Sequence, residues 1–130
     1  MTEKKKPRPR RRPARTPVTY ETVVDLGLRL AGVEESTSYG TPALKVGGRL
    51  LARLKEDGST LVVCTDFQER EALMAADPEV FYITDHYLNY PAILVRLSRV
   101  GREKLAEVLE KAWRQQAPAR FLSARKARRR

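Results

Sequence analysis

Apolar residues recur three and four positions apart in three stretches of this chain, which is the spacing of one face of an α-helix. The predicted helices cover residues 18–33, 66–77 and 102–113. Thr19 is placed to cap the first helix, and Gly32 is placed to end it. Asp66 is placed to cap the second, with Glu69 at the capping-box position and Pro78 just past the end. The third carries an apolar stripe of Leu105, Val108, Leu109 and Ala112, with Trp113 beside it.

Between these helices, short apolar segments bounded by Gly, Pro, Asp and Ser are typical of β-strands. Strands are predicted at residues 36–39, 42–46, 49–55, 59–65, 80–84 and 92–98. Gly47-Gly48 and the hairpin sequence EDGS at 56–59 separate neighbouring strands. Because the connections are short, the strands are expected to pair mainly antiparallel. The predicted order is α-β-β-β-β-α-β-β-α, a two-layer α+β fold with the helices packed on one sheet face.

Alternation along the predicted strands separates two faces of the sheet. The first face is apolar and forms the predicted core: Leu44, Val46, Leu50, Ala52, Leu54, Leu61, Val63, Ile93, Val95 and Leu97. The second face mixes cations with apolar and thiol side chains: Lys45, Leu51, Arg53, Lys55, Val62, Cys64, Leu94 and Arg96. We therefore expect the helices on the first face, with the second partly open to solvent.

The formal net charge of +10 over 130 residues lies at the two ends of the chain. Residues 1–16 hold eight basic side chains and one acidic, and residues 120–130 hold six basic and none acidic. The middle, 17–119, holds twelve basic and fifteen acidic residues. This partition predicts a disordered basic tail at 1–16, one α+β domain at 17–117 and a basic tail at 118–130.

Lysine and arginine gathered at both ends predict contacts with the phosphate backbone of DNA, with little preference for sequence. The expected contacts are Lys4, Lys5, Lys6, Arg8, Arg10, Arg11, Arg12 and Arg15, followed by Arg125, Lys126, Arg128, Arg129 and Arg130. RNA and an acidic membrane surface would attract the same charges, and a solvated end that only aids solubility is the structural alternative. The tails lack an apolar cluster apart from Phe121-Leu122, so membrane insertion is not expected.

Four stretches of the sequence carry a resemblance to a known family. They are GVEESTSYGTPALKVGGRLLARL, DFQEREALMAADPEVFY, AILVRL and LAEVLEKAW, within residues 18–116. Over this range the chain resembles the MmcQ/YjbR-like family. The resemblance implies a small α+β domain similar to frataxin-like and secretion-chaperone-like folds, with a DNA-binding role described as a double wing. Many members carry Lys-x-His-Trp before the penultimate strand, where this chain reads DHYLNYPA.

Four cations on the second face, Lys45, Arg53, Lys55 and Arg96, form a second candidate phosphate-binding surface. The alternative is an ordinary exposed antiparallel face, on which Lys and Arg protect the sheet edges. A protein partner, or a homodimer formed through Leu51, Val62 and Leu94, is a further alternative because apolar residues share this face.

A small-ligand pocket is predicted as a rival site, lined by Tyr39, Lys45, His86 and Tyr90. The alternative reading is that STSYGTP at 36–42 is a turn and that the aromatic residues of DHYLNYP at 85–91 pack on the sheet.

Catalytic and metal-binding patterns are missing from the sequence. His86 is the sole histidine and has no partner motif, while Cys64 alone supports neither an internal disulfide nor a metal cluster. We therefore predict a non-enzymatic protein without a cofactor. The basic N-terminus lacks the apolar segment of a secretory signal, so a cytoplasmic location is expected, associated with the nucleoid if the protein binds DNA.

Overall fold

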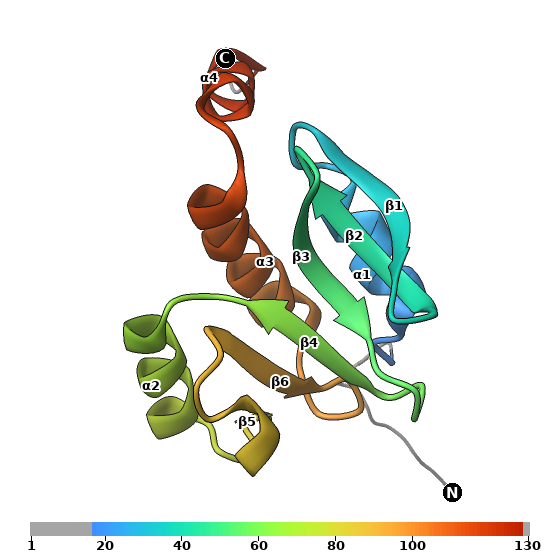
Figure 1. Cartoon of the computed structure of the whole chain (residues 1–130), viewed down its shortest axis with the longest axis vertical. Coiled ribbons are helices and arrows are strands. Elements are labelled where there is room, and N and C mark those ends of the chain that lie inside the picture. The colour runs from blue at the N-terminus through green and yellow to red at the C-terminus, as the bar shows by residue number, and fades with distance from the viewer. Residues whose placement is uncertain (1–16, 129–130) are drawn as a thin grey trace, which may run out of the picture.

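Six strands and four α-helices make up residues 17–128, the part of the chain that this computed structural model describes (Figure 1). The strands are β1 Val33–Ser38, β2 Thr41–Val46, β3 Arg49–Leu54, β4 Thr60–Cys64, β5 Phe81–Tyr82 and β6 Ala92–Arg96. The helices are α1 Tyr20–Gly27, α2 Phe67–Ala76, α3 Arg102–Gln116 and α4 Ala119–Arg128, with a short 3-10 helix η2 at Asp85–Tyr87. The predicted α+β class and element order are confirmed, and α4 follows the last predicted helix.

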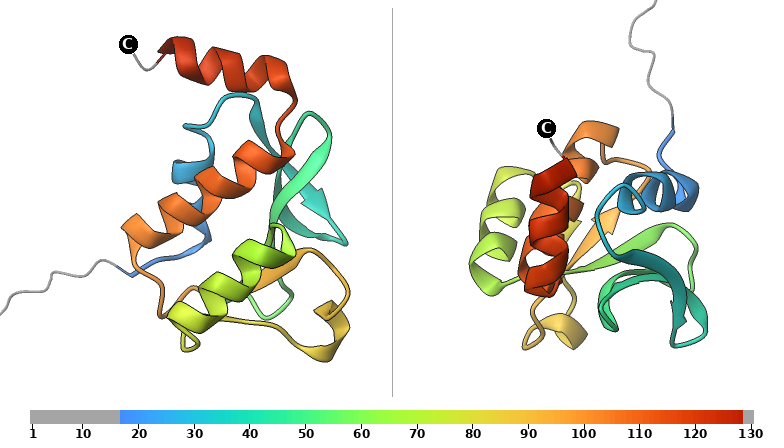
Figure 2. Two further views of the ribbon diagram at one scale, coloured as in Figure 1. Left: turned by 90° about the vertical axis from the view of Figure 1, so that its left-hand side faces the viewer. Right: turned by 90° about the horizontal axis from the view of Figure 1, so that it is seen from above.

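The sheet has the order β1-β2-β3-β4-β6-β5, and every neighbouring pair is antiparallel. Helices α1 and α3 lie on one side of it, and η2 lies on the other (Figure 2). The main core fills the layer between the sheet and these two helices. Trp113 of α3 is buried there, and its indole N–H donates to the carbonyl of Ala31 at 2.8 Å. This hydrogen bond satisfies the polar edge of a large apolar ring.

Helix α1 ends at Gly27, whereas the sequence pattern predicted an end at Gly32. A Cβ at Gly27 would collide with the side chain of Leu44, so the helix runs tight against the sheet at this point. The chain then turns, with the amide of Leu30 donating to the carbonyl of Gly27 at 3.0 Å. Because Leu30 is buried from this turn, the apolar spacing continues past the helix and overstates its length. Strand β1 accordingly starts at Val33, ahead of the predicted 36.

The predicted assignment of Leu51 to the second sheet face is wrong. Leu44 pairs with Ala52 and Lys45 pairs with Leu50, which leaves Leu51 as an extra residue in β3. Such a β-bulge breaks the strict alternation of side chains. Leu51 is fully buried in the main core as a result, and Leu50, predicted to be in the core, is only half-buried.

The N-caps predicted from the sequence are both present. Thr19 caps α1, and the Asp66 carboxylate accepts from the amide of Glu69 at 2.7 Å. The Glu69 carboxylate itself lies 3.6 Å from the ammonium of Lys111 on α3, so this side chain joins two helices.

Two glycines lie close to the start of the C-terminal helix α4 and to Pro118 just before it. A Cβ at Gly32 would stand 2.6 Å from the ring of Phe121, and a Cβ at Gly47 would stand 2.5 Å from Pro118. Both glycines have positive φ, +80° and +59°, in turns that precede β1 and β3. Absence of side chains at these turns lets α4 lie across the end of the domain (Figure 2).

Candidate functional site

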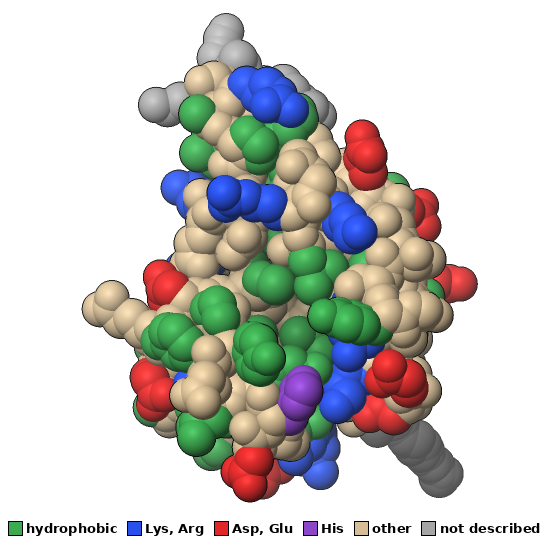
Figure 3. Space-filling view, viewed as in Figure 1, with side chains coloured by type: hydrophobic (Ala, Val, Ile, Leu, Met, Phe, Trp, Pro, Cys, Tyr) green, Lys and Arg blue, Asp and Glu red, His purple; other side chains and the backbone are tan. Residues whose placement is uncertain are grey.

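The sheet face turned away from α1 and α3, here called the front face, carries the candidate site. Strand register places one row of side chains across all six strands: Ser36, Ala43, Arg53, Val62, Leu94 and Tyr82. The row changes from small and polar on the β1 side to apolar on the β5 side. Figure 3 shows this face, with the lone histidine beside Lys and Arg side chains and several apolar ones.

The loop from η2 to β6 covers the apolar half of the front face. Tyr87 is buried against Val62, Ala92 and Leu94, which form a small second core apart from the main one. The alternative reading of this segment, aromatic packing on the sheet, is therefore correct for Tyr87. Tyr90 is different, because 56% of it remains exposed.

Arg70 of α2 holds this loop in place. Its side chain is buried, and its guanidinium donates to the carbonyls of Tyr87, Leu88 and Tyr90 at 2.9, 3.1 and 2.8 Å. The same guanidinium lies over the ring of Phe67 at 4.7 Å from the centroid. Hydrogen bonds to an ionised donor are stronger than neutral ones, so three of them give the loop a defined position.

Sequence reasoning missed the role of Arg70. One signal was available, because Arg70 precedes the core residue Leu73 by three positions and therefore shares the inner face of its helix. An arginine on an inner helix face must find acceptors. Nothing in the local sequence shows that those acceptors are backbone carbonyls some 17 to 20 residues away.

Cations lie over aromatic rings along the front face. The guanidinium of Arg53 is 5.2 Å from the centroid of the Tyr39 ring, and the ammonium of Lys55 is 5.7 Å from that of Tyr87. Arg96 lies 4.0 Å above Tyr82 at the β5 edge. These are cation–π distances, at which the ring attracts the positive charge that lies over it.

His86 and Tyr90 form an aromatic pair at the rim of the front face. Their ring centroids are 5.7 Å apart with an interplanar angle of 30°, and His86 meets Tyr87 edge-on at 4.8 Å. His86 is exposed, and no carboxylate of residues 17–128 forms an ion pair with it.

The four residues of the predicted ligand pocket are only partly gathered. His86 and Tyr90 are neighbours, and Tyr39 stands in the β1–β2 turn, 84% exposed, over Arg53. Lys45 lies toward the β2–β3 turn and pairs across the sheet with Glu34, at the end of the strand remote from Tyr39.

The four predicted sheet cations share the front face but differ in exposure. Arg53 is buried, donates to the Thr41 hydroxyl at 3.0 Å and lies 3.6 Å from the Glu56 carboxylate. Lys45 and Lys55 are half-buried, and Arg96 is exposed.

Most of the predicted tail contacts lie beyond the described residues. This holds for Lys4, Lys5, Lys6, Arg8, Arg10, Arg11, Arg12 and Arg15, and for Arg129 and Arg130. The remaining three, Arg125, Lys126 and Arg128, fall within the α4 helix.

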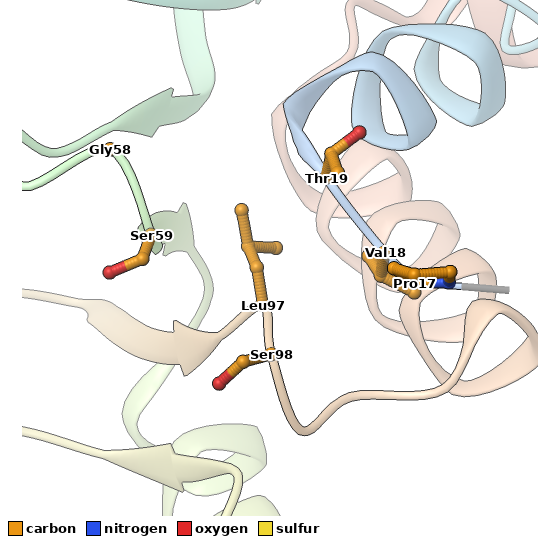
Figure 4. Close-up of a pocket in the computed structure, with 7 residues that line it drawn as sticks. All are labelled: Pro17, Val18, Thr19, Gly58, Ser59, Leu97 and Ser98. Carbon is orange, nitrogen blue, oxygen red and sulfur yellow. The ribbon is translucent and has the colours of Figure 1, made fainter. Parts of the chain in front are cut away.

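A cavity of about 270 Å³ lies where the described chain begins. Pro17, Val18 and Thr19 line it together with Gly58 and Ser59 of the β3–β4 hairpin and with Leu97 and Ser98 after β6 (Figure 4). None of the predicted ligand residues lines this cavity. Its importance is positional, because it shows that the chain enters the domain beside the hairpin that follows Lys55.

Two groups near the site have shifted ionisation. Burial raises the pKa of the Cys64 thiol, which disfavours the reactive thiolate. Hydrogen bonds from the Ser59 amide and the Thr60 hydroxyl lower the pKa of Asp57 in the hairpin. Within residues 17–128 no group of three metal-ligating side chains is found, and none of the helices described is long and apolar enough to cross a membrane.

Comparisons with known proteins give matches to a family model, to curated relatives and to a solved structure. The family model described as YjbR matches residues 28–115. Uncharacterized proteins of Mycobacterium tuberculosis (Rv2570) and Mycobacterium bovis (Mb2600) are 42% identical over 53 residues, 41% of this chain and 41% of each relative. The chain thus matches about two fifths of the length of these relatives.

A crystal structure of Deinococcus radiodurans protein DR2400, described with a DUF419 family-model domain, matches with a TM-score of 0.63. The two are 24% identical, and the match covers 76% of this chain and 79% of that one. This likeness shows a shared fold. The helix α4 begins after the last residue matched by the family model.

Proposed function

The chain belongs to the YjbR family, and we propose that it is a non-enzymatic DNA-binding protein whose basic ends grip phosphates on either side of the front face. The observation that supports this proposal is the placement of the two basic segments. One precedes Pro17, which lies against the β3–β4 hairpin, and the other includes most of α4, which lies across the opposite end of the domain (Figure 1).

The distribution of charge along the chain explains why the position of the two basic segments matters. The body between the basic ends has an excess of acidic residues, so it does not attract a polyanion by its net charge. Eight basic residues in 1–16 and six in 120–130 supply that attraction. Neutralising phosphates releases condensed counterions, which gives affinity with a steep salt dependence and little sequence preference.

The seating of α4 directs one of these charged segments. Phe121 and Leu122 pack against the main core, and Arg120 lies over the Phe121 ring at 4.4 Å. A basic segment that is anchored at its root loses less freedom on binding than one that is free at both ends.

The test is a salt titration of DNA binding by the full chain. Replacing Arg8, Arg10, Arg11 and Arg12 with Gln should lower the slope of log affinity against log salt by roughly three to four on duplex DNA, since each neutralised phosphate contributes about 0.9. The matched control replaces four exposed arginines and lysines of the body, Arg29, Arg99, Lys104 and Arg114, with Gln. This control should leave the slope nearly unchanged. An identical slope in wild type and the tail variant would show that the basic tail does not hold phosphates.

A further inference from the structure

The aromatic rings exposed at the rim of the front face have no role in the phosphate contacts proposed for the basic ends. Tyr39 and Tyr90 are among the largest exposed hydrophobic side chains of residues 17–128, at 84% and 56%. Each belongs to a turn or loop at the rim, and His86 stands beside Tyr90. We propose that these rings stack on unpaired bases, so that the front face selects single-stranded DNA over duplex DNA. The inference rests on the proposed function and names its preferred substrate.

Ring geometry supports stacking. His86 and Tyr90 are inclined by only 30° at 5.7 Å between centroids, so a base stacked on one ring would lie within about 30° of the plane of the other. Aromatic side chains bind single strands by stacking on the faces of bases, and any base can take part. In a duplex those faces are covered by neighbouring base pairs. The same rings therefore have nothing to stack on when the strands are paired.

The loop that carries these rings is already positioned for binding. Arg70 holds the carbonyls on both sides of it, at Tyr87 and Tyr90, and the Tyr90 amide donates to the Tyr87 carbonyl at 3.1 Å. Tyr87 anchors the loop from below through its contacts with Val62 and Leu94. A platform that is ordered before binding costs less entropy when the ligand arrives.

The charges around the rings suit a phosphodiester strand. Lys55 lies beside Tyr87 and forms no ion pair within residues 17–128, although the nearby carboxylate of Asp57 shares part of its charge. Arg53 lies under Tyr39, although Glu56 shares part of its charge. Stacking rings combined with flanking cations are the two elements of a single-strand binding surface.

The N-terminal basic tail joins the domain at Pro17, beside the β3–β4 hairpin that follows Lys55. Pro17 lines a cavity with Gly58 and Ser59, and the Gly58 amide donates to the Lys55 carbonyl at 2.9 Å (Figure 4). Sixteen residues can span about 50 Å when extended, so phosphate contacts by the tail and base contacts by the rim can involve the same strand. Joining two weak sites in one chain raises their combined affinity.

The experiment compares full-length protein on a 20-nucleotide oligothymidine and on a duplex of the same length, at a fixed salt concentration. Wild type should bind the single strand about tenfold or more tightly than the duplex. Tyr90→Leu should reduce that ratio severalfold, while Tyr90→Phe, which keeps the ring, should preserve it. Leu28→Ala, which removes an exposed apolar side chain outside the front face, should also preserve it. Thermal denaturation of each variant checks that the fold is intact.

The outcomes separate this inference from the proposed function. Equal affinity for both oligonucleotides, with a salt slope that depends on the tail, would overturn base stacking and leave phosphate binding standing. No measurable affinity for either would overturn the proposed function itself. A ratio that Tyr90→Leu does not change would show that stacking at this rim is not the source of the preference. A stable homodimer in sedimentation velocity that Tyr90→Leu dissociates would assign the rings to a protein interface instead.

Discussion

The guanidinium of Arg70 donates to the backbone carbonyl of Tyr90 at 2.8 Å, and it does so from the inner face of α2. This contact joins helix α2 to the loop between η2 and β6. Two further carbonyls, those of Tyr87 and Leu88, accept from the same group. One side chain therefore sets the position of the loop that carries Tyr90.

Replacing Arg70 with Met should lower the free energy of unfolding by about 2–4 kcal/mol, because three carbonyls lose a charged donor. Urea denaturation measures this loss. Amide hydrogen exchange should also quicken in residues 87–90, where the loop loses its anchor.

The control for Arg70 is Arg99→Met. Arg99 pairs with Glu79 at 2.8 Å, but 60% of its side chain is exposed. Exposed ion pairs contribute less than about 1 kcal/mol. If both variants lost the same small amount of stability, the three hydrogen bonds of Arg70 would contribute no more than an exposed ion pair.

Gly32→Ala should destabilise the protein more than Gly48→Ala. The two positions have nearly the same φ, +80° and +81°, so Ala suffers about the same backbone strain of roughly 1–2 kcal/mol at each. A Cβ at Gly32 would also meet the ring of Phe121, while at Gly48 no atom lies within 4 Å. We expect an additional loss of about 1–3 kcal/mol at Gly32, as for other overpacked sites. Urea denaturation of the two variants gives the difference.

A double-mutant cycle identifies the source of that difference. Combining Gly32→Ala with Phe121→Ala should remove the additional loss, because the clashing ring is gone. Trypsin should cut within the basic helix α4 faster in Gly32→Ala than in Gly48→Ala. A loss that persists without Phe121 would place the strain elsewhere.

Tyr20 gives a prediction in alkaline solution. Burial, and then the nearby charge of Glu35, raise its pKa to about 12, and its hydroxyl has no hydrogen-bond partner within residues 17–128. Unfolded tyrosine ionises near pH 10. Between pH 10 and 12 the unfolded state therefore loses a proton that the folded state keeps, and stability falls as pH rises.

Tyr20→Phe removes this ionisation and an unpartnered buried hydroxyl. It should be neutral or slightly stabilising at pH 7. Its advantage over wild type should grow as pH rises from 10 to 12, measured by urea denaturation at each pH. A constant difference across that range would show that Tyr20 ionises equally in both states.

The sequence was sufficient to predict the elements that depend on near neighbours. The caps at Thr19 and Asp66 and the apolar stripe that ends at Trp113 are set by spacings of three and four residues. Short turns made antiparallel pairing the expected arrangement. These features are local, so a chain read residue by residue contains the information that determines them.

Errors arose where a distant contact overruled the local pattern. The apolar spacing continued to Leu30, but the helix ended at Gly27, where the hydrogen bonds change to a tighter turn that still buries Leu30. The bulge in β3 places the side chain of Leu51 in the core, although the alternation had predicted it on the front face. Strict alternation cannot reveal an extra residue, because the sequence around it still reads as a strand.

For the candidate site too, the sequence identified residues but not the contacts between them. The charge at both ends, the second-face cations and the aromatic residues of DHYLNYP could all be listed from the sequence. Which of them meet was decided only by tertiary structure, which brings Tyr39 to Arg53 and Tyr87 to Lys55, and leaves Lys45 apart. Arg70 was recognisable only as a helix residue, since its three acceptors come from a loop beyond β5.

The sequence by itself determined the fold class, the caps and the location of charge, because these follow from composition and from spacings within a helical turn or a strand. Tertiary structure alone decided the register of β3, the packing of α4 against Gly32 and the hydrogen bond from Arg70 to Tyr90. Each of these joins residues far apart in the chain, and their geometry depends on how closely the backbones approach, which no local pattern records.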